Sequence, residues 1–367
     1  QDIPEYIELC RKGAYASALR LITEKNPLPF ITGTICAHNC MTKCTRNFYD
    51  QPVNIRATKL VAAEKGYDAY MAKVKSPAPA ATSAKVAVIG GGPTGMSAAY
   101  FVGRAGIPVT IFERTGSLGG VVRQVIPAFR ISDAAIDKDV ALMEKMGVEV
   151  KLNTEAPSVS ELKAMGYTHI FFAVGAWKPG KLDIPGNVVG VIGWLKDMKA
   201  GKEVSLGHVA VVGGGNTALE DAAFLANYCS KVYIIHRRSE FRGEEKLVQS
   251  LKQKKNVEFV LDSKVTALNG TDSLESLIVQ NVETKKEQTI PVSGVFVAIG
   301  QMPQNEKFAG MVDLDAHGYV EAGENCHTNV KGIFVAGDCR TKEVRQLATA
   351  AADGAVAALA ACAYLNQ

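Results

Sequence analysis

The stretch Val86-Ala87-Val88-Ile89-Gly90-Gly91-Gly92-Pro93-Thr94-Gly95 decides the fold. Its four apolar residues predict a short strand, and its glycines precede a helical pattern from Met96 to Arg104. Glycines at such a turn allow a tight bend and let backbone N–H groups approach a pyrophosphate at the helix N-terminus. The next strand pattern, Val109 to Phe112, ends in Glu113, where a carboxylate would accept a ribose hydroxyl. A glycine turn alone is often only a tight turn, but strand, helix and distal acid together predict a dinucleotide site.

The same pattern recurs in residues 209–218. The apolar run Val209–Val212 precedes Gly213-Gly214-Gly215-Asn216-Thr217-Ala218, and a helical pattern continues to Tyr228. Later in each copy an apolar strand pattern ends in glycine, at Gly175 in the first copy and at Gly300 in the second. This ordered repeat predicts two similar nucleotide-binding units of the α/β class, each built on a mostly parallel sheet.

The two copies differ at the end of their second strand. The first ends in Glu113, whereas the second, Lys231 to Ile235, ends in His236-Arg237-Arg238, with Arg242 one turn later. An acid would repel a 2′-phosphate, and guanidinium groups would bind it through charge-assisted hydrogen bonds. A solvated basic strand end is the alternative, but these arginines stand where the ribose carboxylate would be. The second turn is therefore predicted to bind NADPH in preference to NADH.

A third motif lies in residues 332–347. A strand pattern leads into Gly337-Asp338, which places a carboxylate to accept a polyol hydroxyl, and Arg345-Gln346-Leu347 precede an Ala-rich helical pattern from Ala348 to Ala363. The partial positive charge of a helix N-terminus would stabilise the negative charge that reduced flavin carries near N1. Close packing of an Ala-rich helix is the alternative, and both can hold. The first turn and this motif together predict an FAD site.

The sequence thus predicts two sets of cofactor-binding residues and no acid–base catalytic residue, because the cofactors carry the redox chemistry. The FAD set is Gly90, Gly92, Pro93, Thr94, Gly95, Glu113, Arg114, Gly119, Gly120, Val121, Gly175, Gly337, Asp338, Arg345, Gln346 and Leu347. The NADPH set, with NADH as the alternative cofactor, is Gly213, Gly215, Asn216, Thr217, Ala218, His236, Arg237, Arg238, Arg242 and Gly300.

Three parts are predicted along the chain. Residues 1–75 show apolar residues at helical spacing and form a helical domain, and the Pro- and Ala-rich residues 76–84 form a linker. The FAD domain comprises residues 85–198 and 304–367, and an NAD(P)H domain of residues 199–303 is inserted between them.

Composition excludes several classes of protein. The hydrophobic fraction of 47% and the charged fraction of 21% are typical of a globular protein with a large core. The net charge of +4 is small and dispersed, which argues against a nucleic-acid partner. No long apolar run predicts a membrane span, and the acidic, amphipathic start is no secretory signal, so a cytoplasmic location is expected. The chain begins with Gln rather than Met and is interpreted as processed or as a piece of a longer protein.

Three of the eight cysteines form a cluster, namely Cys36, Cys40 and Cys44. Their spacing would place the thiols on one face of a helix, or around an iron–sulfur cluster in a loop. Buried thiols and a zinc site with His38 are the alternatives. The remaining cysteines are interpreted as packing residues: Cys10, Cys229, Cys326, Cys339 and Cys362.

Two family resemblances rest on these motifs. From Lys85 to its end, the chain resembles the flavoprotein disulfide reductases with two dinucleotide folds, and its second half, Lys231 to Gln367, is closer to bacterial thioredoxin reductases, above all in residues 344–354. Asp2 to Gly186 resembles the glutamate synthase small subunit family. That family includes the amino-terminal part of dihydropyrimidine dehydrogenase, the large subunit of the bifurcating ferredoxin:NADP oxidoreductase and a subunit ascribed to selenate reduction. The matching runs are Asp2–Tyr6, Ile31–Cys36, Pro52–Arg56 and Ile126–Arg130.

The resemblance implies an FAD domain split by an NAD(P)H domain, with hydride moving between the two cofactors. In the glutamate synthase-like family the cysteine run helps to bind two [4Fe–4S] clusters together with an upstream run. This chain starts just after the place of that run, so its ligand set is incomplete unless further ligands come from a missing segment or a partner. Thioredoxin reductases carry a dithiol just before the second turn, yet Gly193–His208 has no cysteine, and neither has Gly116–Arg130. Disulfide reduction is therefore not expected. The leading hypothesis is an electron-transfer subunit that passes electrons to an iron–sulfur centre or another subunit; a free-standing reductase and a non-catalytic scaffold are the alternatives.

Overall fold

The computed structural model describes residues 1–179, 207–271 and 273–365. The chain forms two compact units: unit 1 comprises Gln1–Ala176 and Pro303–Gln367, and unit 2 comprises Trp177–Met302. Unit 1 is thus built from two separated stretches of chain, and the N-terminal helical residues belong to it. The predicted boundary between residues 198 and 199 lies outside the described residues and stays a prediction.

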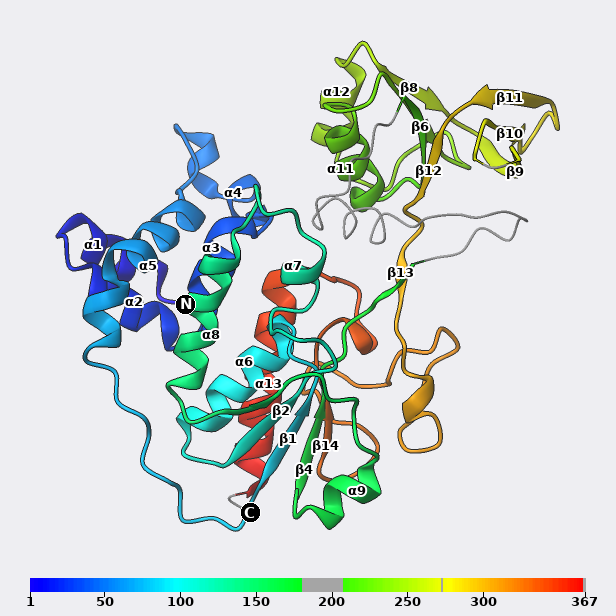
Figure 1. The fold of residues 1–367 in the computed structure, drawn as a ribbon. Coiled ribbons are helices and arrows are strands. Elements are labelled where there is room, and N and C mark those ends of the chain that lie inside the picture. Colours follow the sequence, from blue (N-terminus) through cyan, green and yellow to red (C-terminus); the bar gives the residue numbers. More distant parts are fainter. Residues whose placement is uncertain (180–206, 272, 366–367) are drawn as a thin grey trace. The chain divides into compact units, whose positions relative to one another are not determined.

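The N-terminal part of unit 1 is helical (Figure 1). α1 begins where it does because the Asp2 side chain accepts the N–H of Glu5 and a proline occupies the first turn. Tyr6, Ala18 and Ile22 form its small core with Ala62. The elements are α1 (Ile3–Arg11), α2 (Tyr15–Thr23), α3 (Pro29–Ile35), α4 (Asn39–Thr42), the 3-10 helix η1 (Thr45–Phe48) and α5 (Ile55–Met71).

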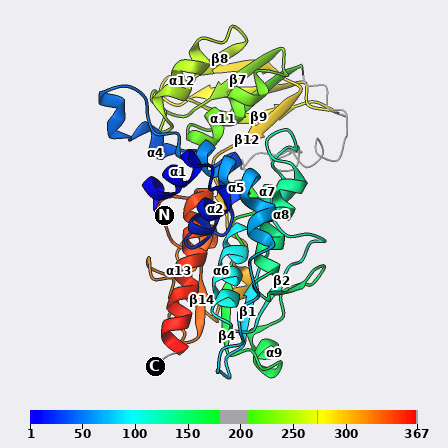
Figure 2. The ribbon, with the colours of Figure 1, turned by 90° about the vertical axis from the view of Figure 1, so that its left-hand side faces the viewer.

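A parallel sheet with the strand order β14-β4-β1-β2-β3 forms the centre of unit 1. Because side chains alternate along a strand, Val86 and Val88 face one core, and Ala87 and Ile89 face the other. The first core is covered by α6, α8 and α13, which lie on one side of the sheet in Figures 1 and 2, and the second by α9 and η2. The strands are β1 (Val86–Ile89), β2 (Val109–Phe112), β3 (Glu149–Lys151), β4 (His169–Phe172) and β14 (Ile333–Val335), and the helices are α6 (Pro93–Arg104), α8 (Asp133–Glu144), α9 (Val159–Ala164), η2 (Glu306–Phe308) and α13 (Leu347–Leu365).

A second parallel sheet, in the order β12-β6-β7-β8, forms unit 2. Two helices cover one face, and a three-stranded antiparallel sheet, β11-β10-β9, covers the other. β5 and β13 pair antiparallel where the chain enters and leaves the unit. The parallel sheets confirm the predicted α/β class. The elements are β5 (Lys178–Pro179), β6 (His208–Val212), α11 (Asn216–Leu225), β7 (Lys231–Ile235), α12 (Glu245–Lys252), β8 (Val257–Val260), β9 (Ser263–Asn269), β10 (Ser276–Asn281), β11 (Glu287–Pro291), β12 (Gly294–Val297) and β13 (Gln301–Met302).

α13 is the one helix among the described residues that is long and apolar enough to cross a bilayer, judged by length and composition over Leu347–Tyr364. The core helix of a soluble protein passes the same test. α13 packs along α6, buries Ala357 and Ala358 fully, and carries the buried carboxylate of Asp353. These contacts make it part of the core of unit 1.

Candidate cofactor-binding sites

The first glycine turn, between β1 and α6, has no room for side chains at Gly90 and Gly95. Gly90 has a φ of +106°, and a Cβ there would lie 2.6 Å from the carbonyl oxygen of Ala173. A Cβ on Gly95 would lie 1.9 Å from the carbonyl oxygen of Gly90. Gly92 is the N-cap of α6, and a proline follows it at the first helical position. The N–H groups of Thr94 and Gly95 lie in the first turn, where helical N–H groups have no intrahelical acceptor and can bind a phosphate.

Glu113 and the glycines that follow β2 close over this turn. Glu113 is only 7% exposed, and its Oε2 accepts the N–H of Gly91 at 2.7 Å. Gly119 donates its N–H to the Gly91 carbonyl at 2.8 Å, and a Cβ on Gly120 would lie 2.8 Å from Gly92 Cα. Val121 follows directly and begins the short helix α7 (Val121–Gln124). The structure therefore brings these predicted FAD residues together, whereas the exposed Arg114 donates to Gln304 Oε1 at 3.5 Å.

The Gly337-Asp338 turn lies against the same end of α6. Gly337 has a φ of +82°, and a Cβ there would lie 2.3 Å from Thr94 Oγ1. Asp338 lies in the 3-10 helix η3 (Gly337–Cys339), and its Oδ1 is buried with no hydrogen-bond partner among the described residues. Burial raises the pKa of Asp338, whereas Lys342 and Arg345 lower it. A buried oxygen without a partner beside a phosphate-binding turn fits a ligand that brings hydroxyl groups, as the polyol of FAD does.

The other predicted FAD residues support this turn from its sides. Arg345 donates from Nε to the Asp338 carbonyl at 3.4 Å, and its guanidinium lies 4.0 Å from the ring centroid of Tyr319. Gln346 and Leu347 stand at the start of α13. Gly175, with a φ of +68°, directs its N–H toward the buried thiol of Cys339. Arg345 therefore holds the backbone that carries Asp338.

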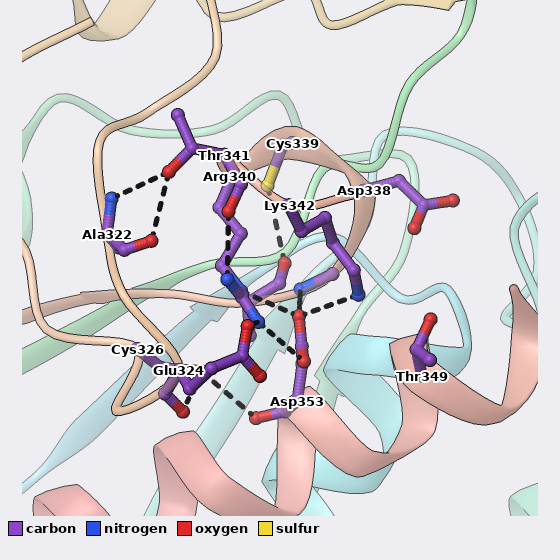
Figure 3. Close-up of polar contacts among 12 residues, drawn as sticks. Ala322, Glu324, Cys326, Asp338, Cys339, Arg340, Thr341, Lys342, Thr349 and Asp353 are labelled. Carbon is purple, nitrogen blue, oxygen red and sulfur yellow. Dashed lines mark hydrogen bonds and ion pairs between the residues drawn. The ribbon is translucent and has the colours of Figure 1, made fainter. Parts of the chain in front are cut away.

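Sequence reasoning missed a buried charge cluster behind Asp338 (Figure 3). Asp353 Oδ2 accepts from Arg340 Nε at 2.8 Å, from Lys342 Nζ at 3.0 Å and from the N–H of Gly337 at 2.9 Å. Burial alone would raise the pKa of Asp353, but the hydrogen bonds from Arg340 and Lys342 outweigh burial and hold it below its ordinary value. The sequence holds one signal of this cluster: Asp353 is the only charged residue among the 19 residues of α13.

The second glycine turn, between β6 and α11 in unit 2, encloses His236. A Cβ on Gly213 would lie 2.4 Å from the carbonyl oxygen of Ala298, and one on Gly214 would lie 2.2 Å from the His236 ring. The ring stacks on Phe241 with centroids 5.2 Å apart. Burial lowers the pKa of His236; the Glu240 carbonyl opposes this shift and nearby arginines add to it. His236 thus packs beneath the turn, where burial favours the neutral form of its ring.

The arginines predicted to bind the 2′-phosphate lie exposed at this edge of unit 2. Arg237 and Arg238 follow β7, and the N–H of Arg242 donates to the Gly214 carbonyl at 2.8 Å. All three charges act on the His236 pKa, so they lie close to the turn. The turn continues through Gly215, the N-cap of α11, into Asn216, Thr217 and Ala218, and Gly300 follows the neighbouring strand β12.

The clustered cysteines do not lie on one continuous helix. The alternative that their three thiols share one helix face is therefore wrong. Cys36 ends α3, His38 adopts a left-handed φ of +49°, Cys40 lies in α4, and Cys44 precedes η1. Within residues 1–179, 207–271 and 273–365, no three Cys, His, Asp or Glu side chains are grouped so that they could hold a metal ion. The described side chains therefore form no preassembled metal site, and the iron–sulfur and zinc interpretations stay predictions.

Gly193–His208 and Gly116–Arg130, where the resemblance would place a redox dithiol, contain no cysteine. Of Gly193–His208, residues 193–206 lie outside the described part of the chain. Gly116–Arg130 contains the glycines that close over the first turn and the helix α7. Among the cysteines interpreted as packing residues, Cys229, Cys326 and Cys339 are buried, and Cys10 and Cys362 are half-buried.

Residues 84–355 match the family described as pyridine nucleotide-disulphide oxidoreductase. The chain belongs to this family. Residues 1–69 match a second family, described as dihydropyrimidine dehydrogenase domain II, 4Fe-4S cluster. Membership of this family makes the chain a flavin oxidoreductase unit whose cofactors are FAD and a pyridine nucleotide.

Several relatives of this pyridine nucleotide-disulphide oxidoreductase are similar over most of its length. It is 36% identical to the protein YgfK of Escherichia coli (strain K12) over an alignment of length 358 that covers 92% of this chain and 35% of YgfK. It is 33% identical to a 34.2 kDa protein in the rubredoxin operon of Clostridium pasteurianum, over 76% of this chain and 96% of that protein. The solved Lactococcus lactis thioredoxin reductase (FR conformation) has a TM-score of 0.66 at 26% identity, over 77% of this chain and 99% of its own.

Proposed function

We propose that this oxidoreductase moves hydride from NADPH to FAD and passes the electrons to an iron–sulfur centre or a partner subunit. Two glycine turns with oppositely charged surroundings carry the proposal: Glu113 closes the first, and Arg237 and Arg238 flank the second. Bound FAD accepts the hydride and supplies the redox chemistry. The chain's own residues then need only bind and orient the two cofactors.

Unit 1 is proposed to hold FAD. The free N–H groups at the start of α6 bind the pyrophosphate. Glu113 accepts a hydrogen bond from a ribose hydroxyl, and Asp338 accepts one from a polyol hydroxyl. The N-terminus of α13 favours negative charge on the reduced ring system.

Unit 2 is proposed to hold NADPH, with its 2′-phosphate on the exposed arginines. Replacing both Arg237 and Arg238 by Ala removes charge-assisted hydrogen bonds worth roughly 1.5–3 kcal/mol each. We expect kcat/KM for NADPH to fall about 100-fold or more, with little change for NADH. The charge-matched control replaces the exposed Lys264 and Lys286 by Ala. An equal loss for both coenzymes would contradict the assignment.

Residues 1–69 are proposed to lie on the route by which electrons leave. The family match to a 4Fe-4S domain and the resemblance to the glutamate synthase small subunit family support this part. We also propose that the chain works within a cytoplasmic complex. The test is iron and sulfide analysis of the whole chain after reconstitution. Replacing Cys36, Cys40 and Cys44 by Ser should remove bound iron, whereas the control Cys362→Ser should not. If the wild-type chain takes up no iron, electrons leave through a partner instead, and FAD reduction by NADPH is unaffected.

Two other functions make different predictions. Relatives named as thioredoxin reductases favour a free-standing reductase, which requires the isolated chain to turn over NADPH with thioredoxin or a quinone. A non-catalytic scaffold would stay colourless when FAD is added. An absorption spectrum with added FAD and NADPH separates these outcomes.

A further inference from the structure

A single carboxylate organises the loop that carries Asp338 (Figure 3). Asp353, 6% exposed, accepts four hydrogen bonds: one from the N–H of Gly337, two from Arg340 and one from Lys342. All three donors belong to the segment 337–342, so the segment is anchored on both sides of Asp338.

The remaining contacts of this segment leave Oδ1 of the Asp338 carboxylate without a hydrogen bond among the described residues. The Cys339 thiol donates to the carbonyl of Phe172, and Thr341 Oγ1 donates to the Ala322 carbonyl at 2.9 Å. In Figure 3 the Asp338 side chain points away from this cluster. The loop is therefore held by its neighbours, while the Asp338 carboxylate is available to a ligand.

Asp353 is the buried counter-charge for both cations of the cluster. Arg340 is 1% exposed and the Lys342 side chain is 4% exposed, so both cations depend on Asp353 for compensation. Glu324 also contacts Arg340 at 3.2 Å, but its side chain is 90% exposed and its charge is screened by water. Removing the charge of Asp353 would leave two buried cations behind Asp338.

We propose that Asp353 is a positioning residue for FAD: it fixes Asp338 toward the cofactor and balances Arg340 and Lys342, so that it lowers the reduction potential of the bound flavin. This inference rests on the FAD site of the proposed function. Reduced flavin carries added negative charge, so uncompensated cations nearby stabilise the reduced form and raise its potential.

The test measures the FAD dissociation constant of the apoprotein and the midpoint potential of the bound flavin. We expect Asp353→Asn to weaken FAD binding about tenfold or more and to shift the potential to more positive values. Lys342→Met removes one cation and keeps the Arg340 pair, so it should retain FAD and shift the potential to more negative values. The control Glu324→Gln should change neither quantity.

The two substitutions should shift the midpoint potential in opposite directions, and a general loss of stability would not produce this result. If Asp353→Asn fails to fold, the shift of the midpoint potential in Lys342→Met tests the proposal on its own. Wild-type affinity and potential in Asp353→Asn with only a lower Tm, or a positive shift in Lys342→Met, would overturn the proposal. Failure of the wild-type chain to bind FAD would instead contradict the proposed function itself.

Discussion

The buried carboxylate of Asp139 accepts the backbone N–H of Ile31 at 2.7 Å. Its other oxygen accepts the N–H of Phe30 at 3.1 Å, so a side chain of α8 caps α3 across 108 residues of sequence. Burial raises the pKa of Asp139, opposed by these two N–H groups and then by Lys59. Because Cys36 is the C-cap of α3, this contact holds the helix that leads into the cysteine segment.

Replacing Asp139 by Ala should lower the free energy of unfolding by about 2–4 kcal/mol, because two N–H groups in the core lose their acceptor. Urea unfolding followed by circular dichroism measures this loss. The control is Asp137→Ala on the same helix, whose exposed carboxylate shares Arg123 with Asp133, so its removal should cost about 1 kcal/mol or less. Equal effects of the two substitutions would contradict the capping role.

Replacing Glu113 by Gln should weaken FAD binding by about 1.5–3 kcal/mol, or roughly 10- to 100-fold. The amide retains only one acceptor oxygen, and its NH₂ would oppose the N–H of either Gly91 or Thr115. Flavin fluorescence during titration of the apoprotein gives the dissociation constant. Glu155→Gln, which alters an exposed pair with Lys307, serves as control and should bind FAD normally.

Replacing Gly214 by Ala should displace the His236 ring, since the new Cβ would lie 2.2 Å from it. We expect NADPH binding about tenfold weaker and a destabilisation of about 1–3 kcal/mol. The double variant Gly214→Ala, His236→Ala removes the clash and should recover part of both losses. A single variant with normal NADPH affinity and normal Tm would show that the ring can move aside.

Replacing Asp221 by Asn should stabilise the protein at high pH. Burial, and then the charge of Glu220, raise the pKa of Asp221 to about 7, and its Oδ2 has no hydrogen-bond partner among the described residues. The folded state thus holds a proton that the unfolded state releases, so stability present at acid pH is lost as the pH rises through about 7.

The gain should be of the order of 1–3 kcal/mol at pH 8 and close to zero at pH 4. Urea unfolding at a series of pH values measures it. The control is Glu283→Gln, an exposed carboxylate of unit 2, which should leave the pH dependence unchanged. A pH-independent effect of the Asp221 substitution would mean that this carboxyl is ionised throughout.

Local patterns predicted the framework well. The strands β1, β2 and β7 begin and end as predicted, because apolar β-branched runs bounded by glycines and charges specify them. α6 begins three residues before the predicted Met96, since the proline of the glycine turn already occupies its first helical position.

Contacts between distant residues could not be predicted from the sequence. The Asp139 cap joins α8 to α3, and the Asp353 cluster depends on a loop and a helix meeting in the fold. The three cysteines do not form the single helix that their spacing allowed, because His38 adopts a left-handed backbone conformation. The spacing of the cysteines does not reveal this conformation. The residues of the glycine turns were predictable because steric fit at each turn is a local property.

The pairing of Lys178–Pro179 with Gln301–Met302 places the two ends of unit 2 side by side. A module with adjacent ends can be exchanged for another by cutting and rejoining the chain at one spot, without rerouting the strands of its host. With the coenzyme assigned to unit 2 as proposed, its choice is separable, in evolution and in engineering, from the choice of flavin.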